Sequence, residues 1–333
     1  MIRKRSLLGA TAYWLTVVAL CVGFAELSVR VWGLMPTYSL QAIAIPYQLR
    51  FKLDEKLLYR FTEDPAHSIN DRGVRDHRFA KKPEGKKRVV VVGDSFPMGL
   101  VVAPQETFPK QLEALLPNAQ VLNLGVQGYG PDQELLFLKE VGPSLDADLI
   151  VWSLFPPNDY NDLIKNRLFR LTPAGTAALN PLNSVSAVLP YSRTFMLLRF
   201  LTTGHFLNSQ VEEQLHPVLF VDHEAPQPVS GDTVALMRAI MADFRDLAAT
   251  LRAKLLAVVI PSFEQVQTNS QAPTTLNASA TESLRTLGVQ TVDLTAPFLN
   301  HPELYTDSEH HLSVAGHQKT AQSLLPAVSD ALR

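Results

Sequence analysis

Four short segments of the chain hold the side chains that could do chemistry. A serine lies in Gly93-Asp94-Ser95-Phe96, and a glycine-rich stretch runs through residues 123–130. An amide follows at Asn158, and residues 307–311 combine a carboxylate with two imidazoles. Nucleophilic catalysis by serine needs a hydroxyl, a histidine base oriented by a carboxylate, and donors for the negative charge that develops on oxygen. All of these group types are present.

Ser95 is the candidate nucleophile. It follows the β-branched run Arg88–Val92, which is typical of a buried parallel strand, and a glycine ends that run. A serine there would lie at the carboxyl edge of a sheet, near a helix N-terminus whose free N–H groups can stabilise an oxyanion. The alternative is an ordinary turn and helix cap. The serine elbow of α/β-hydrolases needs a glycine two places further on, where this chain has Pro97.

Two more segments could supply hydrogen-bond donors. The glycines of Asn123–Gly130 let the backbone approach a ligand, although a flexible strand-to-helix loop has the same composition. Asn158, in Pro156-Pro157-Asn158-Asp159, could donate its side-chain amide to a developing charge. Asparagine and aspartate beside prolines are also common in simple turns.

The segment Asp307-Ser308-Glu309-His310-His311 could supply a base and its orienting carboxylate. A polar loop is one alternative. A metal site is another, with Asp307, His310, His311 and His317 as ligands. Because no further cluster of His or Cys completes a coordination shell, no metal is expected.

Alternating strands and helices must position these groups. Further strands are predicted at 119–124, 149–154, 255–260 and 289–294. Helices are predicted from Phe108 to Leu115, from Pro131 to Val141, from Asp232 to Ala253, and after Ser313 as N-cap. This order predicts an α/β fold with a parallel sheet covered on both faces, and such sheets bind ligands at the carboxyl ends of their strands.

The order of the motifs resembles that of the SGNH, or GDSL, hydrolases over about residues 87–333. Serine follows the first strand, glycine the second and asparagine the third, and Asp and His precede the last helix. The resemblance implies a three-layer α/β/α sandwich with a flavodoxin-like parallel sheet. It also implies Ser95 as nucleophile and an oxyanion hole formed by Ser95, Gly128 and Asn158. Asp307 and a histidine would complete the triad, and no cofactor or metal would be needed.

The choice of histidine stays open between two neighbours. The family usually separates Asp from His by two residues, which selects His310. Its catalytic histidine is also commonly followed by a glycine five places on, which selects His311 because of Gly316. We favour His311, since the turn fixes geometry more tightly than a one-residue difference in the loop.

The N-terminus carries a candidate membrane anchor. Three basic residues, Arg3 to Arg5, precede the uncharged run Leu7–Ala25, which is about long enough to cross a bilayer. An uncleaved anchor is favoured over a cleaved signal peptide or a buried helix. We expect a cytoplasmic tip and transmembrane segment at 1–25, a stalk and edge element at 26–85, and a catalytic domain at 86–333. Residues 163–230 would form an insertion that could act as a lid.

Composition excludes some functions and leaves others. The formal net charge of this 333-residue chain is -2, which gives no reason to expect nucleic-acid binding. A single cysteine, Cys21, rules out an intramolecular disulfide. We therefore expect a membrane-anchored serine esterase outside the cytoplasm that removes ester groups, with O-acetyl groups of a polysaccharide as the favoured substrate. The alternatives are an O-acyltransferase with the same triad and a non-catalytic glycan-binding protein.

Overall fold

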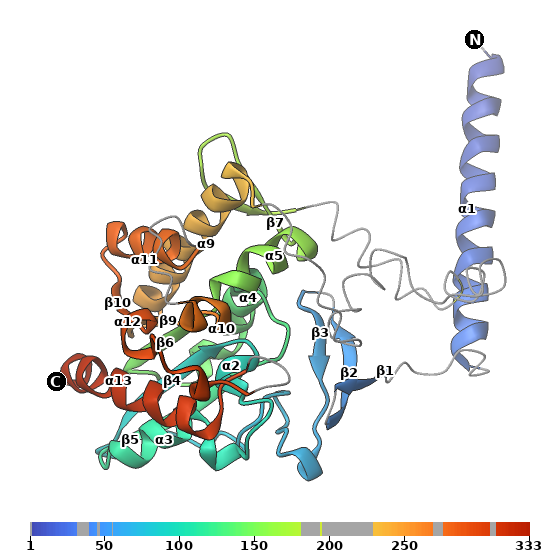
Figure 1. Ribbon diagram of the computed structural model, residues 1–333. Coiled ribbons are helices and arrows are strands. Elements are labelled where there is room, and N and C mark those ends of the chain that lie inside the picture. The colour runs from blue at the N-terminus through green and yellow to red at the C-terminus, as the bar shows by residue number, and fades with distance from the viewer. Residues whose placement is uncertain are drawn as a thin grey trace. The chain divides into compact units, whose positions relative to one another are not determined.

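The computed structural model describes residues 2–31, 40–44, 47–54, 56–180, 194, 229–268, 276–306 and 311–333. The chain divides into two compact units (Figure 1). One comprises Met1–Ser39 and Pro181–Glu213, and the other comprises Leu40–Asn180 and Gln214–Arg333. Every candidate site residue belongs to the second unit, which is described first.

A five-stranded parallel sheet forms the centre of this unit. Its strands are β4 (Lys87–Gly93), β5 (Ala119–Gly125), β6 (Leu149–Leu154), β9 (Lys254–Val259) and β10 (Gln290–Asp293). Their order across the sheet is β10-β9-β6-β4-β5, and all neighbours are parallel. This is the flavodoxin-like order, which reverses direction between β4 and β6. The expected sheet is thus confirmed, and in sheets of this kind ligands bind beyond the carboxyl ends of the two strands at the reversal.

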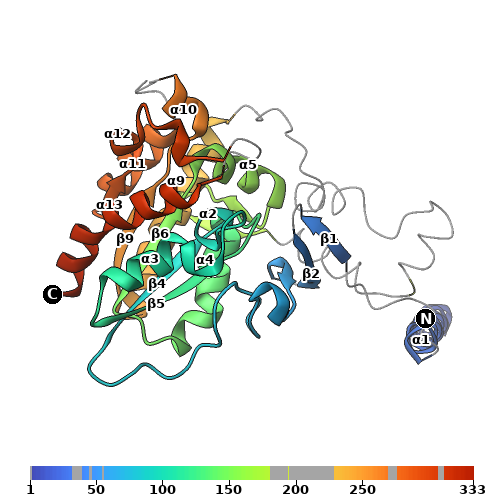
Figure 2. The same ribbon diagram turned by 60° about the horizontal axis from the view of Figure 1, so that its bottom comes forward.

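Helices cover both faces of the sheet (Figures 1 and 2). They are α2 (Ser95–Met98), α3 (Phe108–Leu115), α4 (Pro131–Val141), α5 (Pro156–Asn166), α9 (Gly231–Thr250), α10 (Phe263–Gln267), α11 (Leu276–Thr286), α12 (Thr295–Phe298) and α13 (Val314–Leu332). Helices α3 and α13 pack together on one face, and α4, α5, α9 and α11 pack on the other. The expected three-layer sandwich is therefore present.

Alternate residues of each strand enter the two cores. Val89 and Val91 of β4 join a buried cluster with Leu112 of α3 and Leu324 of α13. On the other face Trp152 of β6 stacks on Phe244 of α9, with ring centroids 4.0 Å apart. Because side chains point alternately to the two faces of a strand, a strand buried on both faces is apolar at nearly every position. This explains the uninterrupted valines of β4.

An antiparallel three-stranded sheet precedes β4 in the chain. It consists of β1 (Leu40–Ala44), β2 (Tyr47–Asp54) and β3 (Leu58–Phe61), in that order. A two-stranded hairpin of β7 (Phe169–Leu171) and β8 (Ala177–Leu179) follows α5. This hairpin lies within the predicted insertion at 163–230, whose first residues belong to α5. Residues 181–193 and 195–228, where a lid was expected, lie outside the described residues.

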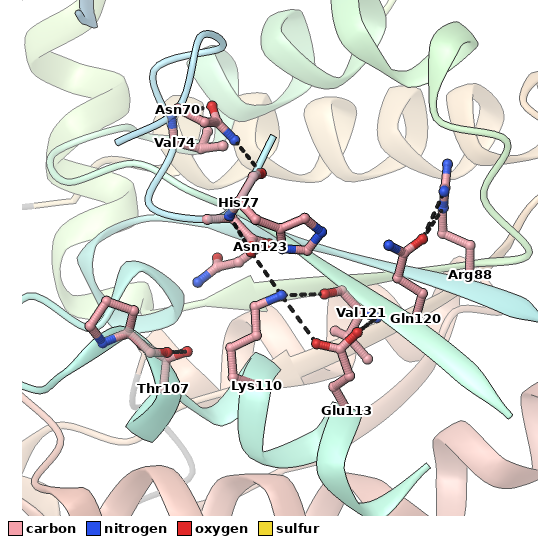
Figure 3. Close-up of polar contacts among 12 residues, drawn as sticks. Asn70, Val74, His77, Arg88, Thr107, Lys110, Glu113, Gln120, Val121 and Asn123 are labelled. Carbon is pink, nitrogen blue, oxygen red and sulfur yellow. Dashed lines mark hydrogen bonds and ion pairs between the residues drawn. The ribbon is translucent and has the colours of Figure 1, made fainter. Parts of the chain in front are cut away.

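Residues 70–77, which connect β3 to β4, are fastened to the parallel sheet by buried polar contacts. Asp76 accepts a hydrogen bond from the Asn123 N–H of β5 at 2.8 Å and pairs with Lys110 of α3 at 2.8 Å. Figure 3 shows that Lys110 also reaches the Val121 carbonyl and Glu113. Burial would raise the pKa of Asp76, but hydrogen bonding to His77 and the Lys110 charge outweigh it and hold that pKa below its usual value. Part of the segment expected as a stalk thus packs on the sheet domain.

The other unit contains one long apolar helix, α1 (Ile2–Val31). Its stretch Gly9–Val29 is long and apolar enough to cross a membrane, and 6% of the best window is buried within the protein. Tyr13, Trp14 and Leu20 are among its exposed large apolar side chains. The predicted apolar helix is therefore present. Because a signal sequence passes the same test of length and composition, anchoring in a membrane remains a proposal.

Candidate active site

The turn after β4 presents Ser95 at the carboxyl edge of the sheet. Asp94 is the N-cap of α2, and its carboxylate accepts the Phe96 N–H at 3.0 Å. Ser95 is the first residue of this short helix, so its own N–H lies among the donors that a helix leaves without an intrahelical partner. The turn is thus both a helix cap and the support of the candidate nucleophile.

Two glycines let this turn lie directly against the strands. A Cβ atom at Gly93 would come within 2.9 Å of Ser153 on β6, and one at Gly125 within 2.4 Å of the Met98 nitrogen. Real Cβ atoms do not approach other atoms so closely, so any side chain at these positions would push α2 away. Asn123 adds a hydrogen bond from its amide to the Pro97 carbonyl at 2.6 Å.

The structure brings His311 to Ser95. The Nε2 atom of His311 lies 3.0 Å from the Ser95 Oγ, although 216 residues separate them in sequence. That is within the hydrogen-bond range required of a general base. Phe96 packs beside the imidazole with ring centroids 5.5 Å apart, and Phe155 packs on Phe96 at 4.3 Å. An aromatic wall therefore flanks the Ser–His pair.

Backbone contacts on both sides fix the segment around His311. Its carbonyl accepts the Thr306 N–H at 2.8 Å, and the Ser313 N–H donates to the Leu304 carbonyl at 2.9 Å. Ser313 caps α13, as expected, by accepting the Gly316 N–H at 3.2 Å. A Cβ atom at Gly316 would lie 2.1 Å from the Leu304 carbonyl oxygen. The glycine five places after His311 is therefore required by close packing.

Two predicted residues of this segment, Asp307 and His310, lie outside the described residues. Their expected roles stay predictions. His317, the remaining residue of the metal alternative, is buried in α13 and accepts the Phe108 N–H through Nδ1 at 3.1 Å. Burial lowers its pKa to about 3, so this imidazole is neutral and structural. Within the described ranges no group of three His, Cys, Asp or Glu residues could hold a metal ion.

Asn158 lies beyond β6, in the first turn of α5. Its Nδ2 donates to the Asp94 Oδ2 at 3.2 Å, which ties the amide to the turn that carries Ser95. A turn was the alternative for this segment, but a helix starts directly at Pro156, because proline fits the first helical positions, where an N–H is not needed. An amide has two hydrogens, so one remains after the bond to Asp94.

Gly128 lies in the loop between β5 and α4. Its φ of +75° is a left-handed conformation that favours glycine. The preceding residues are held in place, because the Val126 N–H donates to the Gly93 carbonyl at 3.0 Å and the Gln127 N–H to the Met98 sulfur at 3.3 Å. The loop therefore lies beside the Ser95 turn.

Buried carboxylates surround the site, and the sequence analysis did not anticipate them. Asp94, Asp132, Glu134 and Asp159 are all at most 1% exposed. Burial raises the pKa of Asp94 and of Asp132 to about 6, and it raises those of Glu134 and Asp159 well above their usual values. The sequence carried one signal of these buried carboxylates. Asp132, Glu134 and Asp159 occupy helix positions where an amphipathic pattern would place apolar side chains.

Comparison with known proteins finds similar solved structures but no matching sequence. No family model and no curated protein matches the sequence. Similar solved structures include a GDSL-like lipase from Bacteroides thetaiotaomicron, with a TM-score of 0.43 and 16% identity, covering 76% of this chain and 93% of that one. A lipase/acylhydrolase from Enterococcus faecalis has a TM-score of 0.42 and 11% identity, covering 73% and 96%. An acetyl xylan esterase has a TM-score of 0.38 and 12% identity, covering 72% and 99%. At such scores, this chain's chemistry has to be inferred from its own side chains.

Proposed function

We propose that this protein is a serine esterase of the SGNH type. The observation that carries the proposal is the 3.0 Å approach of the His311 Nε2 to the Ser95 Oγ at the carboxyl edge of a parallel sheet. A serine hydroxyl is a weak nucleophile until a base accepts its proton, and an imidazole at this distance is that base. In the proposed triad, Asp307 is the residue that orients the imidazole.

The reaction proceeds through an acyl-enzyme. The Ser95 Oγ attacks the ester carbonyl carbon while its proton passes to the His311 Nε2, giving a tetrahedral oxyanion. The Ser95 N–H, the Gly128 N–H and the Asn158 amide donate to that oxygen. The intermediate collapses, and the departing alkoxide takes the proton from the imidazolium. Water then attacks the acyl-serine with His311 again accepting a proton, which releases the acid and restores Ser95.

The substrate class follows from the expected location. Three basic residues before an apolar helix favour a cytoplasmic N-terminus, and in the proposed topology the catalytic unit faces the outer side of the membrane. Esters that a domain in that position meets include O-acetyl groups of cell-surface polysaccharides, and these are the proposed substrates. The site needs no cofactor or metal in this mechanism.

The test is covalent labelling of Ser95 with a fluorophosphonate probe. Ser95→Ala should abolish labelling, because the attacked atom is gone. His311→Ala should slow it by roughly 1,000-fold or more, as removal of a triad member does elsewhere. His310→Ala is the matched control and should label normally, since adjacent side chains point in different directions. Wild-type labelling rates in both histidine variants would refute the proposed triad.

Unlabelled enzyme, in which Ser95 is free to react, reports the reaction type, and the labelled protein reports location. It should sediment with membranes and stay there after a high-salt wash; recovery in the soluble fraction would contradict the anchor. Incubation of the unlabelled enzyme with an acetylated oligosaccharide should release acetate, with water as the acyl acceptor. Transfer of the acetyl group to a second sugar in place of acetate release would identify an O-acyltransferase that uses the same residues.

A further inference from the structure

The peptide bond between Gln127 and Gly128 is held by a side chain from outside the parallel sheet. The hydroxyl of Tyr59, on β3, donates a hydrogen bond to the Gln127 carbonyl oxygen at 2.5 Å. The two residues are 68 positions apart in sequence. The N–H of this same peptide unit belongs to Gly128, the expected oxyanion donor.

Peptide geometry links the two ends of that unit. A trans peptide is planar, and its C=O and N–H groups point in opposite directions. A hydrogen bond that fixes the Gln127 oxygen toward Tyr59 therefore fixes the Gly128 N–H away from Tyr59. Among the described residues, no hydrogen-bond acceptor is recorded for that N–H. It is thus a donor with a fixed direction.

Without Tyr59 this peptide could rotate. Gly128 has a positive φ, but glycine adopts positive and negative φ angles at little cost. The backbone preference of Gly128 therefore does not fix the orientation of the Gln127–Gly128 peptide plane. The Gln127 N–H bond to the Met98 sulfur restrains the preceding peptide unit, not this one. In the described part of the chain, the Gln127 carbonyl accepts a hydrogen bond from the Tyr59 hydroxyl, and this bond restrains the Gln127–Gly128 peptide directly.

Tyr59 is itself rigid. Its side chain is 2% exposed, and its ring packs edge-on against Tyr129 with centroids 5.3 Å apart and against Phe61 at 6.1 Å. The Tyr129 hydroxyl donates to the Tyr59 carbonyl at 2.7 Å, which holds the backbone as well. Burial raises the pKa of the Tyr59 phenol well above its usual value, so the hydroxyl keeps its proton and stays a donor.

We propose that Tyr59 is a positioning residue of the oxyanion hole, which holds the Gln127–Gly128 peptide so that the Gly128 N–H faces the reacting carbonyl. The proposal rests on the esterase function proposed above. A hydrogen bond to the carbonyl also polarises the peptide, which makes its N–H a stronger donor. A strand before the catalytic sheet thereby contributes to transition-state stabilisation without touching substrate.

Tyr59→Phe tests the proposal, because it removes one oxygen and leaves the ring. Full-length protein in detergent is assayed with a chromogenic acetyl ester, and kcat is expressed per site titrated with fluorophosphonate. Loss of a whole oxyanion donor costs about 100- to 1,000-fold, so a donor that is present but free to turn should cost about tenfold. The KM should stay within about twofold, since ground-state binding does not use this donor.

A transition-state mimic separates positioning from general loosening of the fold. A boronic acid forms a tetrahedral adduct with serine and needs the oxyanion donors, so its affinity should fall by the same factor as kcat/KM. The pH profile of kcat/KM should keep its midpoint, because the Ser95–His311 pair is untouched. Tyr160→Phe removes an equally buried phenolic hydroxyl from α5, and its kcat should stay within about twofold.

The outcomes are distinct. If Ser95→Ala retains wild-type turnover, the esterase function fails and the role of Tyr59 with it. If Ser95→Ala is inactive while Tyr59→Phe matches the wild type in kcat and boronate affinity, the role of Tyr59 alone is overturned. An equal loss in Tyr160→Phe also overturns it. Should Tyr59→Phe not fold, 3-fluorotyrosine at position 59, which keeps the hydroxyl, should retain wild-type kcat; a tenfold loss in folded protein would contradict the proposal.

Discussion

In the proposed mechanism, the two hydrogens of the Asn158 side-chain amide have different acceptors. One hydrogen of its Nδ2 is used by the Asp94 carboxylate at 3.2 Å, and this bond sets the orientation of the amide. The second hydrogen is then directed by the planarity of the group. Asp94 also accepts the Phe96 N–H, so a single carboxylate orients the asparagine and caps the helix of Ser95. The nucleophile and the oxyanion donor are therefore positioned by the same side chain.

Replacing Asn158 should therefore impair catalysis more than folding. Asn158→Ala is expected to lower kcat by about 100- to 1,000-fold, the usual cost of one oxyanion donor. Asn161→Ala is the matched control, because Asn161 lies on the same helix and its amide donates to the Pro157 carbonyl of that helix. Steady-state turnover of an acetyl ester measures both. Turnover near the wild-type value in Asn158→Ala would refute the role of Asn158 as an oxyanion donor and leave it only a structural role at the start of α5.

The sequence predicted the site residues better than the residues that support them. Ser95 and His311 could be found because each follows or precedes a strongly patterned element, and the structure pairs them. Asp94 and Tyr59 act through bonds to partners 64 and 68 positions away, and such pairings leave no local pattern. The choice of His311 over His310 was favoured by Gly316, whose close packing against Leu304 supplies a physical reason.

Among the elements, the connection from β3 to β4 has the largest structural consequence. Asp76 joins it to α3 through Lys110 and to β5 through Asn123, and both partner groups are buried. Without Asp76, Lys110 would keep the partly exposed Glu113 as a carboxylate partner in place of a buried one, and breaking a buried ion pair from one side is strongly destabilising. The connection is therefore part of the folded domain's polar interior.

Asp76→Ala should reduce the free energy of unfolding by about 3–5 kcal/mol, the usual cost of breaking a buried ion pair from one side. Asp71→Ala is the control, since Asp71 is exposed on the same connection and should change stability by less than about 0.5 kcal/mol. Urea unfolding followed by circular dichroism measures both. Equal stabilities of the two variants would show that the Lys110 charge is balanced elsewhere.

Secondary structure was predictable where periodicity was strong. The strands expected at 119–124 and 149–154 are observed within one residue, and so are the helices at 108–115 and 131–141. The helix of Asn158 was not foreseen, because Pro156 and Pro157 are equally typical of a turn. The contacts of Asp76 could not be foreseen either, since a buried aspartate has no sequence pattern of its own.

Across the whole molecule, the buried carboxylates couple stability to pH. The pKa of Asp132 is raised by burial to about 6 in the folded protein, from 3.8 in solution. Between these values the folded state holds a proton that the unfolded chain has released, so stability falls as pH rises. The stability that comes from the proton on Asp132 is fully lost above the pKa of the folded state. A pKa shift of this size corresponds to about 3 kcal/mol of unfolding free energy.

Asp132→Asn should flatten this dependence, because an amide does not ionise. Between pH 4.5 and 7.5 the variant should gain about 2–3 kcal/mol relative to the wild type. Urea unfolding at the two pH values measures the difference, with the exposed Asp71→Asn as reference. A parallel change in wild type and Asp132→Asn would mean that this carboxyl does not titrate in the range.

The long separation of Ser95 and His311 has a consequence for the newly made chain. Synthesis runs from the N-terminus, so the strand and turn that carry the serine leave the ribosome well before the histidine exists, 216 residues later. Helix α13 follows His311 directly, and its Ala321, Leu324 and Val328 must enter the core to hold that end of the chain in place. In the proposed mechanism, the nascent protein therefore carries an inert serine until the segment of His311 has been synthesised. Ester cleavage becomes available only once α13 has also been made and has packed on the sheet.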